Sequence, residues 1–392
     1  MSNVKDGFSF YSNHKDPFIE YKRPLNVQAL PKIHFNIVNF LLLALCPIYL
    51  VYVLFDYRKE IKEGKKEGRL PSLMNIEFLR ILFTLGVLDV HIRSNIYHWW
   101  SSGGQGVEFF FLLSGYLLSL TYKPERGLLD IAKRNWIRFV PLIVTCCLIK
   151  GRGLESFYGL FMLQNTGLAF MDIPNGPAWY IAVLFWCSLF YLAIMKAMEP
   201  ATRNLLISSL VFMSYILVVR VGGDRWDMIA GYIPRGLLRG VAGMGLGILL
   251  AQVCVRKAGI EILSKPKKIV YSFAELSILL YVIISCVKRE LYIEEWIFRP
   301  IIHVALLSLF IMKRGYVSSF FERPIFSKLS KYCLAIYLTH AAITYYPNYF
   351  LWKGTNDYSS VGLAFLYSCV LGVSLYYLVE KPCVRYLSKV SI

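Results

Sequence analysis

Charged residues are scarce in this chain: Asp, Glu, Lys and Arg make up 17% of its 392 residues, against 56% that are hydrophobic. A soluble protein of this length has too little interior to bury so much apolar surface. Metal-binding patterns are missing as well. The nine cysteines include no CxxC pair and no Cys/His group at ligand spacing. We therefore expect a membrane protein without a metal site or a disulfide framework.

Long apolar runs recur along the chain. A membrane-spanning helix needs about 20 mostly apolar residues. The runs therefore predict an all-α fold, a polytopic transmembrane helical bundle of about 10–11 helices, although several runs fall short of that length. They cover residues 35–55, 79–92, 107–122, 137–149, 178–195, 205–219, 237–255, 269–287, 297–312, 329–345 and 361–379.

The lysines and arginines gather in alternate loops between these runs. With residues 56–72 taken as cytoplasmic, one set of loops holds 26 Lys/Arg and the intervening set holds nine. This is the positive-inside pattern, which fixes the orientation from the second run onward. The net charge of +18 is thus a topology signal. We expect a lipid bilayer, and no nucleic acid, as the partner of this charge.

The chain divides into an N-terminal extension, 1–72, and a membrane domain, 73–392. The extension holds the 35–55 run and a basic linker, 56–72. If 35–55 spans the membrane, the N-terminus lies outside, although residues 1–34 carry five Lys/Arg. A span is favoured over an interfacial or re-entrant helix, and both alternatives stay open.

Ionisable residues at membrane depth are costly, so each is a candidate for function. Arg80 and His91 are eleven residues apart, which is about 1100° of helical rotation, so they share one face roughly 16 Å apart. A guanidinium binds phosphate, and an imidazole can accept a proton from a hydroxyl. One helix thus offers an anion clamp near the cytoplasm and a base near the outside. Alternatively, Arg80 snorkels and His91 lies among the headgroups.

The next run begins close to Glu108, which could orient or charge-stabilise His91. An interfacial, water-exposed Glu108 is the alternative. Ser114 and Gly115 follow on the same run, where close helix packing is favoured over a nucleophilic serine. No GxSxG motif surrounds Ser114.

Further polar residues lie along the later runs. Arg134 and Arg138 are one helical turn apart and suit the phosphates of a nucleotide-bearing donor, or else anchor the helix by the positive-inside rule. Arg239 lies among glycines that allow close packing around a buried cation. His303 and His340 are intramembrane, where a lone histidine is more often a hydrogen-bonded packing residue. Trp179 fits an aromatic belt.

These residues together resemble the acyltransferase-3 family of membrane acyltransferases. The matching pieces stand in the family's order over about residues 73–388. They are Arg80 and His91 with ten residues between them, 106–115, Arg134 and Arg138 before Pro141, Pro177 to Trp179, 334–340, and 380–382.

The resemblance implies about ten helices with a cytoplasmic C-terminus, in the bacterial cytoplasmic membrane. It implies an acyl-CoA donor, acetyl-CoA by preference, and an acceptor hydroxyl on a surface polysaccharide or lipid-linked glycan. His91 would be the catalytic base or an acyl-relay residue, with Glu108 as its support, and Arg80 would bind the donor with Arg134 and Arg138. Ser114, Trp179, Arg239 and His340 would support the substrate or the structure.

Two features depart from the family. Relatives with fused periplasmic domains often carry an acidic pair where Leu184 and Phe185 stand here, so no carboxylates can be assigned there. The extension 1–72 precedes the usual start of the family and is a candidate docking site for glycan-assembly proteins.

Two other functions remain open on the sequence. A glycan or small-molecule transporter, or flippase, could use the same intramembrane charges as a relay. A scaffold could use them to lock helices together. The enzyme is favoured because the arginines lie on the predicted cytoplasmic side and no inverted repeat is evident.

Overall fold

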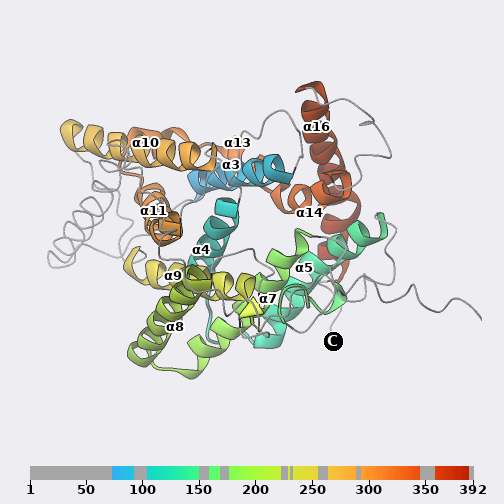
Figure 1. The fold of residues 1–392 in the computed structure, drawn as a ribbon, viewed down its shortest axis with the longest axis horizontal. Helices are drawn as coiled ribbons and strands as arrows, with labels where there is room; N and C mark the ends of the chain where they lie inside the picture. The colour runs from blue at the N-terminus through green and yellow to red at the C-terminus, as the bar shows by residue number, and fades with distance from the viewer. Residues whose placement is uncertain are drawn as a thin grey trace, which may run out of the picture.

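A computed structural model describes residues 73–91, 104–149, 159–167, 176–221, 228–229, 233–254, 264–287, 293–344 and 358–387. Within these ranges the chain is helical apart from one pair of two-residue strands and the connecting turns (Figure 1). The predicted extension, with its 35–55 span, lies outside the described residues.

The helices, in chain order, are α3 (Met74–His91), α4 (Gly104–Leu120), α5 (Leu128–Ile149), α7 (Ala178–Ala197), α8 (Pro200–Val221), α9 (Arg235–Cys254), α10 (Lys265–Val287), α11 (Ile293–Met312), α12 (Tyr316–Phe320), α13 (Pro324–Ser330), α14 (Cys333–Thr344), α16 (Tyr358–Leu375), the π-helical turn η4 (Tyr376–Glu380) and α17 (Lys381–Leu387). The strands β1 (Met228–Ile229) and β2 (Ile233–Pro234) pair antiparallel just before α9.

Each predicted apolar run between residues 79 and 379 contains a helix. Five described segments are long and apolar enough to cross a membrane, and they are Ala178–Ala197, Pro200–Val219, Arg235–Cys254, Lys265–Ser285 and Gly362–Leu387. Shorter apolar stretches lie in α4 and α11. The predicted all-α, polytopic membrane fold is confirmed.

The helices α3 and α5 are not among these five segments, and both carry charged residues within their length. α5 starts at Leu128, nine residues before the apolar run predicted from 137, and its first turns include Asp130, Lys133 and Arg134. The predicted run 329–345 is interrupted after α13, and α14 begins only at Cys333. Arg80 on α3 and Arg138 on α5 therefore sit on helices whose charged residues interrupt the apolar pattern.

α4 and α9 pack backbone to backbone at the centre of the molecule. A Cβ added to Gly115 would lie 2.0 Å from the carbonyl oxygen of Met244, and one added to Gly247 would lie 2.0 Å from that of Leu112. No larger residue fits at these crossings without moving a helix. The glycines therefore set how closely α4 approaches α9.

The apolar core forms two clusters, and α4 contributes to both. One cluster joins side chains of α5, α7, α9 and α14, and the other joins α3, α4, α10 and α11. Figure 1 shows α4 between α10 and α11 on one side and α5 and α7 on the other. Polar residues of α3, α4 and α5 can therefore meet where the two clusters adjoin.

Candidate functional site

α3 carries Arg80 and His91 as the sequence predicts. The Nη1 of Arg80 forms a 2.7 Å ion pair with Glu77, one turn earlier. His91 ends the helix, and its Nδ1 lies 2.8 Å from the backbone oxygen of Val87. A carbonyl oxygen only accepts hydrogen bonds, so Nδ1 is the donor, and in the neutral ring Nε2 keeps the free lone pair. α3 thus holds a fixed cation and, farther along, a basic ring nitrogen.

A cavity of about 210 Å³ lies beside Arg80, between α3, α4, α5, α7 and α14. Its walls combine two arginines with hydroxyl, aromatic and aliphatic side chains. They are Arg80, Thr84, Phe110, Leu113, Ser114, Leu117, Arg138, Phe139, Tyr180, Ile181, Leu184, Cys333, Leu334 and Tyr337. Two guanidinium groups in a mostly apolar space suit a ligand with an anionic head and an uncharged arm.

The two arginines of the predicted inner pair have different surroundings. Arg138 lines the cavity, and its Nε lies 3.7 Å from Oε1 of Glu380, a buried carboxylate of η4. Arg134, one turn earlier on α5, is exposed, as Arg138 also is, but it is not part of the cavity wall. The structure therefore brings Arg138, and not Arg134, to the cavity wall together with Arg80.

At the other end of α3, His91 packs against His340 of α14. Their ring centroids are 4.8 Å apart, with the planes tilted by 53°. His340 is fully buried, and its ring also contacts Tyr337, with the centroids 5.8 Å apart. The Tyr337 hydroxyl donates a 3.0 Å hydrogen bond to the carbonyl oxygen of Pro177. Because Tyr337 also lines the cavity, α14 connects the cavity wall to the histidine pair.

The cavity wall on α3 ends at Thr84, whose hydroxyl donates a 2.8 Å hydrogen bond to the backbone oxygen of Arg80. From Thr84 to His91 is seven residues, or about 10 Å along the helix. Buried Val87 and Leu88 lie in this interval. Residues 92–103, which follow His91 in the chain, lie outside the described residues.

Glu108 is engaged elsewhere than at His91. Its Oε1 lies 2.5 Å from Nε of Arg239, and both side chains are buried. Within the described residues its Oε2 has no hydrogen-bond partner. The Arg239 guanidinium also lies 5.3 Å from the ring centroid of Trp179. Glu108, Arg239 and Trp179 thus link α4, α9 and α7, and the predicted support of His91 by Glu108 is matched by no described contact.

Ser114 faces the cavity, where its hydroxyl lies 3.4 Å from the hydroxyl of Tyr180. The next residue, Gly115, is the one packed against the backbone of α9. Ser114 therefore lies in the cavity wall, and Gly115 lies in the contact between α4 and α9. Among the described residues the Ser114 hydroxyl meets only that of Tyr180, so no described base is placed to activate it as a nucleophile.

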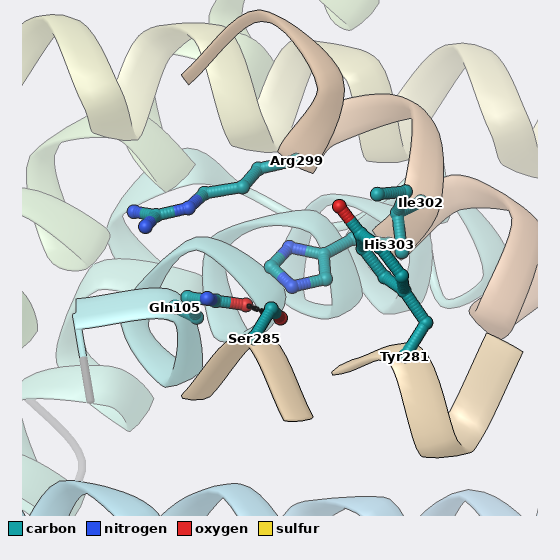
Figure 2. A pocket seen from close by; sticks show the side chains of 6 residues that line it. All are labelled: Gln105, Tyr281, Ser285, Arg299, Ile302 and His303. Carbon is teal, nitrogen blue, oxygen red and sulfur yellow. Dashed lines mark hydrogen bonds between the residues drawn. The ribbon is translucent and has the colours of Figure 1, made fainter. Parts of the chain in front are cut away.

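A second, smaller cavity lies on the other side of α4 (Figure 2). Its volume is about 10 Å³, which is room for about one water molecule. It is lined by Gln105, Tyr281, Ser285, Arg299, Ile302 and His303. Ser285 Oγ donates a 3.2 Å hydrogen bond to Oε1 of Gln105.

The ring of His303 points into this second cavity (Figure 2). Within the part of the chain that the structure describes, neither of its nitrogens has a hydrogen-bond partner. The expectation of a hydrogen-bonded packing residue stays a prediction for His303. Its ring is edge-on to Phe83 and Phe109. Phe110, which contacts Phe83, lines the first cavity. An aromatic layer therefore separates the two cavities.

Sequence reasoning missed several groups of the site. Glu380 stands in the 380–382 motif, and nothing in its spacing reveals that it meets Arg138. No pattern in the sequence marks Tyr180 or Thr84 as cavity residues. A weak signal existed for Tyr337, because it precedes His340 by three residues and so shares its helical face.

Comparison with known proteins supports an assignment at the level of the family. A family model described as an acyltransferase domain matches residues 74–379. No curated protein and no solved structure matches the chain. The matched region contains the whole of α3, the cavity and the histidine pair. Over this region, which is most of its length, the chain belongs to the acyltransferase-3 family of membrane acyltransferases.

Proposed function

We propose that this membrane acyltransferase transfers an acetyl group from cytoplasmic acetyl-CoA to a hydroxyl of a surface polysaccharide or lipid-linked glycan, in a bacterial cytoplasmic membrane. The observation that carries the proposal is the two-ended arrangement of α3. Arg80 lines a cavity with Arg138 at one end, and His91 packs against His340 at the other.

The donor end is supported by charge and shape. Coenzyme A carries phosphates on a long, uncharged pantetheine arm, and arginine forks bind phosphate oxygens in pairs. Arg138 also lies on the side of the membrane where the loops are rich in Lys and Arg, which the charge bias predicts to be cytoplasmic. An arm extending from the arginines along α3 would run toward His91.

The chemistry follows from the orientation of the His91 ring. Nε2 accepts the proton of the acceptor hydroxyl while the hydroxyl oxygen attacks the thioester carbonyl. The new C–O ester bond forms, the C–S bond breaks, and the thiolate of coenzyme A leaves and takes up the proton from His91. A two-step route through an acyl-histidine would use the same nitrogen and is the alternative.

The test is the O-acetyl content of the surface glycan in cells that carry either the wild type or His91→Ala at equal membrane abundance. We expect the acetyl groups to disappear while the glycan keeps its length. The matched control is His303→Gln, a buried histidine outside the first cavity, which should retain acetylation. A glycan that is itself depleted would indicate transport, and unchanged acetylation in His91→Ala would indicate a scaffold.

A further inference from the structure

Three tyrosine rings gather beside the cavity at the end where Arg138 lies. Tyr332 comes from the turn between α13 and α14, and Tyr376 and Tyr377 come from η4. The Tyr332 centroid is 5.1 Å from that of Tyr376 and 6.0 Å from that of Tyr377. The hydroxyls of Tyr332 and Tyr377 lie 2.8 Å apart. Two segments distant in sequence thus build one aromatic cluster.

Two lysines complete this cluster. The Nζ of Lys331 lies 4.7 Å from the ring centroid of Tyr332 and 5.8 Å from that of Tyr377. The Nζ of Lys381 lies 5.4 Å from the Tyr377 centroid. Both lysines are exposed, and among the described residues neither forms an ion pair with a carboxylate. The cluster therefore combines aromatic faces with two cations that no described carboxylate neutralises.

The tyrosine–lysine cluster adjoins the cavity through two separate parts of the chain. Cys333 and Leu334, directly after Tyr332, line the cavity. Glu380, three residues after Tyr377, lies 3.7 Å from Arg138, which also lines the cavity. The segments 313–331 and 381–392 belong to the Lys/Arg-rich set predicted to be cytoplasmic. The cluster thus stands at the cytoplasmic end of the cavity.

This chemistry matches one part of an acyl-CoA donor. Aromatic rings stack on nucleobases, and lysines bind phosphate groups as point charges. Resting on the proposed function, we infer that the cluster of Lys331, Tyr332, Tyr376, Tyr377 and Lys381 binds the adenosine bisphosphate end of the donor. The pantetheine arm would then enter the cavity past Arg138.

The experiment compares two donors on the full-length protein in detergent free of phospholipid. Acetyl-CoA carries the nucleotide, whereas S-acetyl-4′-phosphopantetheine lacks it. For the double variant Tyr377→Leu with Lys331→Gln, we expect the Kd for acetyl-CoA to rise about tenfold. The Kd for the phosphopantetheine donor should stay at the wild-type value, which also shows that the cavity is intact.

A second Lys/Tyr pair provides the matched control. The Nζ of Lys268 lies 4.4 Å from the ring centroid of Tyr316, away from the cavity wall. The double variant Tyr316→Leu with Lys268→Gln should bind both donors as the wild type does. An equal rise in the Kd for acetyl-CoA in this control and in the cluster variant would contradict the assignment of the cluster.

Other outcomes overturn the inference in different ways. Unchanged acetyl-CoA binding in the cluster variant, with a loss of co-purified anionic lipid, would make the cluster a headgroup site. Equal loss of both donors would make it a structural element of the cavity. If the wild-type protein binds neither donor, the proposed function itself fails. If the wild type and the cluster variant bind acetyl-CoA equally well, only the assignment of the cluster fails.

Discussion

Arg134 and Arg138 look equivalent in the sequence, yet only Arg138 lines the cavity, where it meets Glu380. We therefore predict that Arg138→Lys raises the KM for acetyl-CoA about tenfold, since lysine keeps the charge but loses the fork. Arg134→Lys, outside the cavity wall, should leave KM unchanged. Steady-state kinetics with purified protein measure both. Equal KM changes for the two variants would show that the cavity is not the donor site.

His340 is the described partner of the His91 ring, and we assign it a positioning role. His340→Gln should lower kcat about tenfold or more while leaving the KM for acetyl-CoA unchanged. The pH dependence of kcat should change too, which a simple packing defect would not cause. A variant with wild-type kcat and pH profile would remove His340 from the mechanism.

For single residues, the sequence predicts how two side chains on the same helix are placed relative to each other. Arg80 and His91 could be placed on one face because helical rotation is a local property. Contacts between helices could not be predicted in the same way. Glu108 pairs with Arg239, which is 131 residues away in the sequence. No spacing rule reveals such a partner, whereas the predicted support of His91 by Glu108 uses only their proximity in the chain.

Among the elements, the crossing of α4 and α9 depends on glycine. Gly115→Ala would place a methyl group 2.0 Å from the Met244 carbonyl oxygen, so the helices must separate, at a cost of about 1–3 kcal/mol. The thermal unfolding midpoint in detergent should fall. Gly362 of α16 has nothing within 4 Å of an added Cβ, so Gly362→Ala should leave the midpoint unchanged or raise it. Equal midpoints for the two variants would refute the tight crossing.

A buried carboxylate of α10 holds the segment that leads to α12. Glu275 accepts hydrogen bonds from the backbone nitrogens of Gly315 and Ser318, each 2.9 Å long, and one from the Ser318 hydroxyl. Glu275→Gln should cost about 1–3 kcal/mol, because an amide nitrogen would face backbone donors. Denaturation of the purified variant measures the loss.

The control for that variant is Glu322→Gln in the same segment. Glu322 pairs with Lys313 and is partly exposed, so its loss should cost less than about 1 kcal/mol. If both substitutions cost the same, Glu275 does not hold the segment in place.

Hydropathy predicts that each of these helices exists, but it does not predict the residues at which a helix begins and ends. The helix α5 begins at Leu128, before the apolar run that starts at 137. Its first turn carries the exposed Asp130, and an acidic side chain there is favoured by the helix dipole. The strands β1 and β2 are two residues each, too short to leave an alternating pattern.

For the whole molecule, composition and charge distribution predict the membrane fold because both are sums over many residues. The cavity does not follow from them, since it requires five helices to converge. The proposed function gives the reaction a direction, in which the donor would enter among the arginines at one end of α3 and the acceptor would meet His91 at the other.

The most direct test of that claim measures acetyl-CoA binding and acetyl transfer on the same purified His91→Ala protein. We expect the variant to bind acetyl-CoA at the wild-type Kd while transfer falls to background, because the arginine cavity is intact and the base is gone. Transfer at the wild-type rate, or loss of donor binding together with transfer, would contradict it.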